Sequence, residues 1–195
     1  MSREKLANRI SDLLNPYYSS SPFFLLVAIG SSKSIGAAII YWLILTLFFS
    51  ALPLWDIKRR IRLGLVKDAH ISTREDRIKP FIFSLSCAVL GLIAVYLASA
   101  PEAIKAISWV VVLTGIVITI ITIFWKISLH AAGITSIVLA LVFLYGKIAA
   151  PIVILVPLVI WARFTLRKHT PTQLAAGTLL AATIVLMVFA HFSLL

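Results

Sequence analysis

Long runs of apolar residues, separated by short polar segments, dominate the pattern of this chain. A transmembrane helix needs roughly 20 predominantly apolar residues. The pattern therefore predicts six membrane-spanning helices, at about 35–55, 80–100, 104–125, 129–146, 148–166 and 171–193. The fifth run contains Pro151 and Pro157, which a membrane helix tolerates when neighbouring groups satisfy the freed backbone carbonyls.

The first 34 residues follow a different pattern. Leucine and isoleucine recur at helical spacing in the opening 14 residues, with charged residues on the other faces, which predicts a short helix lying in the membrane interface. Ser2 is placed to cap this helix, and Asn15-Pro16 to end it. Residues 22–30, "PFFLLVAIG", would span roughly 14 Å as a helix, so they are predicted to dip into the membrane or to extend the next helix. The apolar positions of the opening helix are Leu6, Ile10, Leu13 and Leu14.

Composition supports a membrane protein. The chain of 195 residues is 61% hydrophobic and 13% charged, with a mean hydropathy of +1.05. We therefore expect an all-α, multi-pass protein of a prokaryotic plasma membrane, in which six transmembrane helices form a bundle (35–195) preceded by an interfacial or re-entrant segment (1–34). All 195 residues are predicted to form one integral-membrane domain.

The positive charge is concentrated between the apolar runs. A net charge of +11 would favour a nucleic-acid partner in a soluble domain, but here the basic residues are placed to meet anionic headgroups or an anionic substrate, and no nucleic-acid partner is expected. With six spans, the loops 56–79, 126–128 and 167–170 share one face, which the excess of cations predicts to be cytoplasmic. Its cations are Lys58, Arg59, Arg60, Arg62, Lys67, Arg74, Arg77, Lys79, Lys126, Arg163, Arg167 and Lys168.

Three of the predicted helices begin on this basic face. Pro80 opens the second span, Ser128 is placed to cap the fourth, and Thr170-Pro171 reads as a cap followed by proline at the first helical position of the sixth. Helix N-termini carry partial positive charge and unsatisfied N–H groups. Together with Lys126 they predict an anion-binding site.

Two of the four histidines lie where these helices start. His130 falls in the first turn of the fourth span, and His169 directly precedes the cap of the sixth. One imidazole can attack phosphorus or abstract a proton while another protonates the leaving oxygen, and arginines can bind phosphate oxygens in bidentate fashion. The pair therefore predicts phosphoryl-transfer chemistry, whereas His70 and His191 are predicted to have interfacial or packing roles.

Two segments carry a family resemblance. "KISLHAAG" (126–133) and "WARFTLRKHTPTQ" (161–173) resemble the second and third motifs of the type 2 phosphatidic acid phosphatase superfamily, which read Pro-Ser-Gly-His and Ser-Arg, five residues, His, three residues, Asp. Ser128 and His130 keep the Ser-x-His of the former, and Arg163 and His169 keep the arginine-to-histidine spacing of the latter. The resemblance covers roughly residues 72–180.

The resemblance implies a role for each matched residue. His169 would be the nucleophile that forms a phosphohistidine, and His130 would be the acid for the leaving alcohol. Ser128 and Arg163 would hold phosphate oxygens. The expected substrate is a lipid mono- or diphosphate, such as that of an isoprenoid.

The first motif of the family, lysine, six residues, Arg-Pro, is matched more loosely. "REDRIKP" (74–80) occupies its place, with Lys79-Pro80 standing where Arg-Pro is expected. Ser72 stands at the position of the first lysine, so Arg74 or Arg77 would have to replace that cation.

The other two motifs also depart from the family pattern. Ile127 and Leu129 replace the proline and glycine of the second motif, and Ala162 replaces the serine of the third. Gln173 stands where an aspartate would orient the nucleophilic histidine. Its carbonyl can accept the imidazole N–H but brings no charge, unless Glu75 or Asp76 supplies the carboxylate.

Three functions remain open at the level of sequence. The first is a lipid phosphate phosphatase that needs no metal or cofactor, since no metal-binding spacing such as HExxH is present. The second is a catalytically weak relative that binds or translocates an anionic lipid, as the missing aspartate suggests. The third is a small structural membrane subunit.

Overall fold

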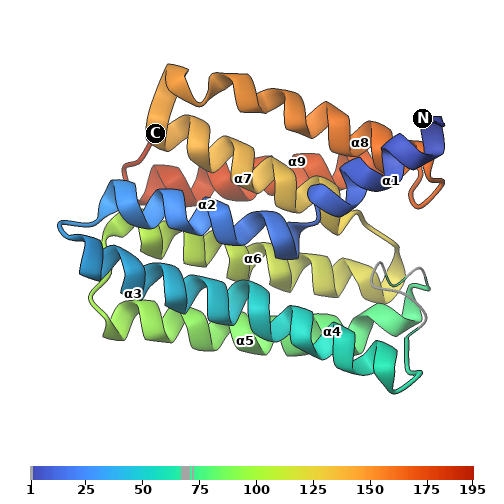
Figure 1. Ribbon diagram of the computed structural model, residues 1–195, viewed down its shortest axis with the longest axis horizontal. Helices are drawn as coiled ribbons and strands as arrows, with labels where there is room; N and C mark the ends of the chain where they lie inside the picture. The colour runs from blue at the N-terminus through green and yellow to red at the C-terminus, as the bar shows by residue number, and fades with distance from the viewer. Residues whose placement is uncertain (1, 67–70, 72) are drawn as a thin grey trace. The chain divides into compact units, whose positions relative to one another are not determined.

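The computed structural model describes residues 2–66, 71 and 73–195 (Figure 1). These residues form helices joined by turns and loops, with no β-strand among them, which confirms the predicted all-α class. His70, Lys67 and Ser72 were considered in the sequence but lie outside the described residues.

Five helices in the described part of the chain are long and apolar enough to cross a membrane, which indicates a multi-pass membrane protein. They coincide with five of the six predicted spans. The first extends well past the predicted end near residue 55. The five segments are Ile35–Arg62, Glu75–Leu97, Glu102–Phe124, Leu129–Ile148 and Pro171–His191.

The remaining predicted span, 148–166, is shorter and irregular. Its first part is a five-residue 3-10 segment (Ala150–Ile154) with Pro151 near its start, and only the last 11 residues form an α-helix, α8 (Leu155–Thr165). Pro157 lies in the first turn of α8, where a missing N–H costs no intrahelical hydrogen bond. Whether this segment crosses the membrane stays a prediction.

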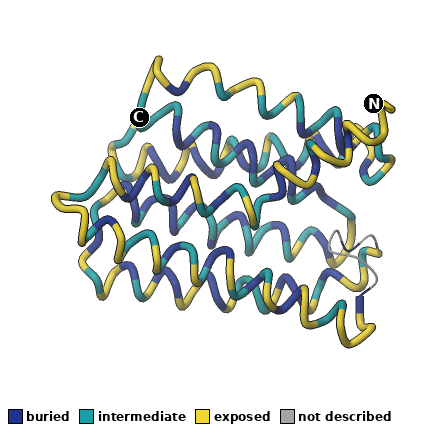
Figure 2. Tube along the Cα trace, viewed as in Figure 1, coloured by how far each residue is buried: buried dark blue, intermediate teal, exposed yellow. Residues whose placement is uncertain are grey.

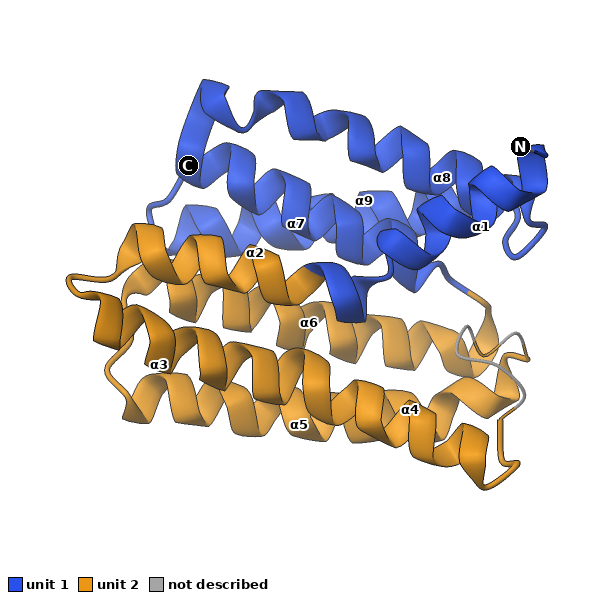
Figure 3. Cartoon of the chain, in the orientation of Figure 1, with its two compact units in different colours: residues 1–19, 127–195 blue, residues 20–126 orange. Residues whose placement is uncertain are grey.

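The chain forms two compact units, drawn in different colours in Figure 3. Unit 1 comprises residues 1–19 and 127–195, and unit 2 comprises residues 20–126. In unit 1, α7 (Leu129–Tyr145) packs along α9 (Pro171–His191) and against α8, and α8 also packs against α1 (Arg3–Leu13). That these units act as one domain remains a prediction.

Unit 2 is built on a long helix with a local irregularity. α3 (Ile35–Thr46), a π-helical turn (Leu47–Ala51) and α4 (Leu52–Arg62) run on without a break in the helix, and they pack against α5 (Ile78–Leu97). α5 in turn packs along α6 (Glu102–Phe124).

The opening helix has the predicted cap, but only part of its predicted apolar face is buried. The Ser2 side chain accepts a hydrogen bond from the backbone N–H of Lys5, which confirms the cap. Ala7 and Ser11 are fully buried, however, whereas Leu13 is 75% exposed. Small side chains at i and i+4 lie on the buried side of α1, which packs against α8, and Leu14 and Ile10 of the predicted apolar positions also pack into the core.

The segment after the first helix is also helical. α2 runs from Pro16 to Ser31 and contains the predicted 22–30 segment. A new helix starts at Ile35 with Ser34 as its cap, so α2 does not extend the next helix. Its insertion into the membrane stays a prediction.

Unit 1 has an apolar core at the level where α1, α7 and α8 meet. Leu14, Ile134, Val138 and Val159 form a buried cluster, and buried positions recur along α7 and α9 (Figure 2). His130 lies one helical turn before Ile134, and Arg163 one turn after Val159. A layer of buried polar residues therefore adjoins the apolar core at the N-terminal end of α7.

Candidate functional site

The predicted site residues fall in both units. Ser128, His130, Arg163, His169 and Gln173 all belong to unit 1, and each polar group among them lies near the start of α7 or α9 or the end of α8. Unit 2 contains the other four, Lys126, Arg74, Arg77 and Lys79.

The N-terminus of α7 is capped as predicted. The Ser128 side chain accepts a hydrogen bond from the Ala131 N–H at 3.2 Å, and Ser128 is fully buried. Because this contact uses the hydroxyl as an acceptor, its O–H can still donate to an oxygen of a bound anion. His130 is the second helical residue and is only 7% exposed.

The N-terminus of α9 carries a complete capping box, which confirms the predicted cap. The Thr170 hydroxyl accepts from the Gln173 N–H at 3.3 Å, and the Gln173 side-chain oxygen accepts from the Thr170 N–H at 3.2 Å. Pro171 occupies the first helical position. The Gln173 side chain is thereby held in one orientation.

The same glutamine oxygen orients His169. Gln173 Oε1 lies 3.2 Å from His169 Nδ1. Since the Thr170 N–H can only donate, the atom that faces it is the amide oxygen rather than the amide nitrogen. An amide oxygen cannot donate, so Nδ1 must carry a proton, and in the neutral ring Nε2 then has the lone pair. Nε2 is therefore the ring atom with nucleophilic character.

The starts of α7 and α9 are in direct contact. The Ser128 N–H donates to the Gln173 backbone carbonyl at 3.3 Å. Gly177, one turn further along α9, lies against the Ser128 carbonyl, because a Cβ placed there would be 2.6 Å from that oxygen. Two of the three predicted helix N-termini therefore meet at one end of unit 1, and they bring His130 and His169 to that end.

Arg163 lies in the last turn of α8 and is 1% exposed. Its Nη1 donates to the Ser11 hydroxyl at 2.8 Å, and Ser11 is itself fully buried. The Arg163 carbonyl accepts from the Lys168 N–H at 3.1 Å in the turn that leads to His169. The sequence analysis missed Ser11. The signal that could have found it is the small polar side chain on the Ala7 face of α1.

The loosely matched first motif is folded differently from the prediction. α5 begins at Ile78, two residues before Pro80, and a 3-10 turn (Glu75–Arg77) precedes it, so this helix start has no side-chain cap. Arg74 donates to the Ile123 carbonyl at 2.8 Å near the end of α6 and pairs with Glu75 at 2.8 Å. Both residues therefore take part in local contacts of unit 2.

The other unit 2 candidates differ in exposure. Arg77 is 3% exposed, and its Nε donates to the Ile71 carbonyl at 2.7 Å. Lys79 is exposed, and Lys126 is half-buried in the link between α6 and α7. No three His, Cys, Asp or Glu side chains come together as metal ligands within the described residues.

Comparison of the chain with models of protein families, with curated proteins and with solved structures gives no match.

Proposed function

We propose that this chain is an integral-membrane phosphatase that hydrolyses a lipid mono- or diphosphate, such as that of an isoprenoid alcohol, through a phosphohistidine intermediate. The observation that supports it most directly is the hydrogen bond between His169 Nδ1 and Gln173 Oε1, because it leaves the lone pair on Nε2. The resemblance of residues 126–133 and 161–173 to the phosphatase motifs points to the same residues.

In the proposed first step on a lipid monophosphate, His169 Nε2 attacks phosphorus and the bond to the lipid alcohol breaks; on a diphosphate it attacks the terminal phosphorus, and the lipid monophosphate is the leaving group. His130 donates a proton to the leaving oxygen, which departs from the monophosphate as the neutral alcohol. In the second step His130, now neutral, takes a proton from water as that water attacks the phosphohistidine. Phosphate leaves, and His169 returns to its starting form.

Charge on the phosphoryl oxygens would be balanced by groups of unit 1. Arg163 brings a guanidinium, Ser128 an O–H donor, and the starts of α7 and α9 bring backbone N–H groups. Of these groups, Ser128 and the backbone N–H groups lie at the starts of α7 and α9, which belong to helices long enough to span a bilayer. A lipid could keep its tail in the membrane while its headgroup reaches them.

The direct test is release of inorganic phosphate by the purified chain in detergent, with chelator present, from polyprenyl phosphate, polyprenyl diphosphate and phosphatidate. Release from at least one substrate is expected. Absence of release, with the fold verified, would contradict a hydrolytic role.

Saturable binding of lipid phosphates without hydrolysis would instead favour a catalytically weak lipid-binding protein. The neutral Gln173 is the observation that favours this alternative, since a glutamine cannot stabilise an imidazolium by charge. In that case binding should survive His169→Asn.

Restoring a carboxylate beside His169 should speed turnover. We expect Gln173→Glu to raise the rate of phosphate release about tenfold, because a hydrogen bond to a charged acceptor is roughly twice as strong as a neutral one. Glutamate keeps the side-chain length and can still close the capping box with Thr170.

The matched control is Gln173→Met, which keeps the side-chain length but removes the acceptor, and it should slow release. The rates of phosphate release are compared in detergent at a temperature at which both variants are fully folded. Equal rates for the glutamate and methionine variants would show that position 173 does not serve His169.

A further inference from the structure

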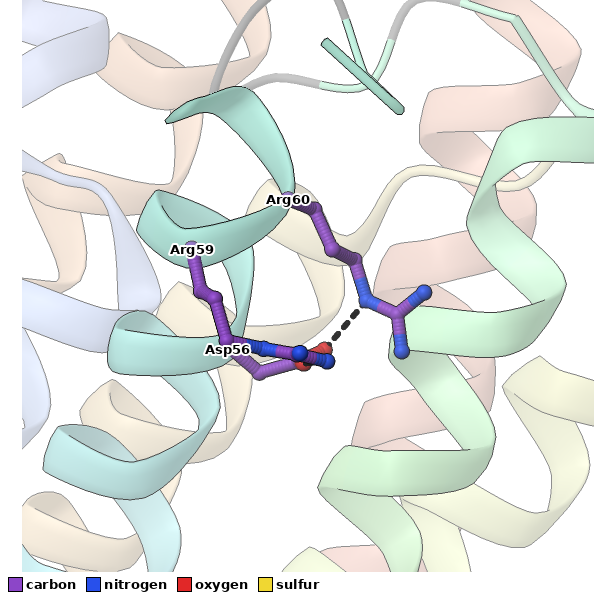
Figure 4. Close-up of polar contacts among 3 residues, drawn as sticks. All are labelled: Asp56, Arg59 and Arg60. Carbon is purple, nitrogen blue, oxygen red and sulfur yellow. Dashed lines mark hydrogen bonds and ion pairs between the residues drawn. The ribbon is translucent and has the colours of Figure 1, made fainter. Parts of the chain in front are cut away.

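A buried carboxylate near the end of α4 holds two arginines in place. Asp56 is 1% exposed, and its Oδ2 accepts from Arg60 Nε at 2.5 Å (Figure 4). Its Oδ1 accepts from Arg59 Nη2 at 3.3 Å. The spacings i, i+3 and i, i+4 place all three side chains on one side of the helix.

This contact refines the sequence-based interpretation of these arginines. Arg59 and Arg60 were expected to set the topology or to face lipid. In the structure a buried acid also pairs with both side chains, and a helix that is apolar up to Trp55 ends in a basic turn, residues 56–62. Burying a carboxylate is costly unless it is paired. Because Asp56 must stay paired, the fold determines how the Arg59 and Arg60 guanidinium groups are oriented.

Among the described residues, most of the hydrogen-bonding capacity of Arg60 is not used. Its side chain is only 14% exposed, yet within the described part of the chain it has no acceptor other than Asp56. Only Nε is occupied, and Figure 4 shows both Nη nitrogens on the far side of the guanidinium from Asp56. Largely buried guanidinium donors require acceptors, and a phosphate offers several.

An aromatic ring completes the basic turn. The Arg59 guanidinium lies 5.6 Å from the centroid of the Trp55 ring, and Trp55 is 51% exposed. Exposed tryptophans at span ends favour the level of lipid headgroups. Leu63 and Leu65, directly after the helix, are each 59% exposed, so apolar surface adjoins the cations.

The charge of this segment favours an anion. Lys58 and Arg62 are also exposed, and one acid faces four cations between residues 56 and 62. Residues 56–62 therefore carry an excess of three positive charges, and the aromatic Trp55 and the aliphatic Leu63 and Leu65 lie beside them. Phosphate oxygens match the guanidinium groups, and acyl chains match the exposed tryptophan and leucines.

We propose that the end of α4, from Trp55 to Arg62, is a binding site for the headgroup of an anionic phospholipid. The lipid phosphate accepts hydrogen bonds from Arg60 and Arg59, and the glycerol backbone packs beside Trp55. The site is built from residues of unit 2 alone and does not depend on the proposed phosphatase activity.

The test is titration of the purified full chain, in dodecyl maltoside, with dioleoyl phosphatidylglycerol, followed by native mass spectrometry. Saturable binding is expected, and it should be tighter than that of dioleoyl phosphatidylcholine, whose choline repels the cations. Arg60→Gln should weaken phosphatidylglycerol binding about tenfold, because it removes hydrogen bonds between charged groups. The Arg59 side chain is 44% exposed, so Arg59→Gln should not disturb the fold. It should weaken phosphatidylglycerol binding several-fold.

Lys33→Gln is the matched control. It removes the same charge from an exposed position just before the other end of the Ile35–Arg62 helix, and binding should change by less than about twofold. Equal weakening by Arg59→Gln and Lys33→Gln would overturn the site. Two results would overturn the assignment to an anionic lipid. One is an equal affinity for phosphatidylcholine and phosphatidylglycerol; the other is displacement of the lipid by an equal concentration of inorganic phosphate.

Discussion

Replacing His169 by alanine is expected to lower the rate of phosphate release from a lipid phosphate by at least about 10³-fold. The substitution removes the proposed nucleophile, and loss of a nucleophile leaves only the contribution of binding and charge stabilisation. Because His169 is 6% exposed and its truncation can lower stability, the fold of the variant is verified by thermal unfolding in detergent before rates are compared. The measurement is inorganic phosphate released per minute by equal amounts of folded protein.

His191→Ala provides the matched control. His191 belongs to the same unit as His169 but lies at the far end of α9, where its ring contacts Phe192. Its loss should leave the rate within about twofold of wild type. If His169→Ala and His191→Ala release phosphate at the same rate as wild type, the activity does not arise at this site.

Gly177→Ala is expected to destabilise unit 1 and to reduce phosphate release about 10²-fold. The added Cβ would lie 2.6 Å from the Ser128 carbonyl oxygen, and this oxygen belongs to backbone that cannot rotate away. The starts of α7 and α9 must therefore separate, at a cost of about 1–3 kcal/mol for overpacking. Separation moves His130 relative to His169, and a displacement near 1 Å can cost about 10²-fold in rate. Thermal unfolding in detergent and the release assay measure the two effects.

Gly115→Ala is the control that distinguishes the clash between α7 and α9 from the change in helix propensity when glycine is replaced by alanine. Gly115 lies within α6, and its added Cβ would make an ordinary contact of 3.5 Å with Leu85. It should raise stability by about 0.5–1 kcal/mol, because alanine favours a helix interior, and leave activity unchanged. Equal behaviour of the two alanine variants would show that the contact between α7 and α9 is not tight at Gly177.

Local sequence signals predicted local structure well. The caps at Ser2, Ser128 and Thr170 were predictable because each depends on a side chain and an N–H three residues away. The apolar helices were predictable because length and composition decide whether a helix can span a bilayer. The segment 148–166 is less regular than its apolar composition predicts, because a 3-10 segment with Pro151 near its start precedes an 11-residue α-helix.

Contacts between distant segments could not be predicted. Ser11 and Arg163 are 152 residues apart, and nothing in the spacing of apolar residues specifies that Ala7 and Ser11 pack inward while Leu13 is exposed. Asp56 likewise is the first residue of the predicted 56–79 loop. Its burial depends on how α4 packs against α5, which the spacing of charges does not encode.

The candidate site was predictable only in part. The Arg163 to His169 and Ser128 to His130 spacings indicated the residues, and the capping box shows how Gln173 can orient His169 without a carboxylate. The expectation that Arg74 replaces a phosphate-binding lysine receives no support, because its guanidinium binds Glu75 and the end of α6.

The most direct test of the central claim is trapping of the covalent intermediate. The chain is mixed with ³²P-labelled lipid phosphate, quenched in base within milliseconds, and digested for mapping. The account predicts base-stable, acid-labile label on the peptide that contains His169, and none in His169→Ala. Phosphate release by wild type with no label at His169, or with label on another residue, would contradict it.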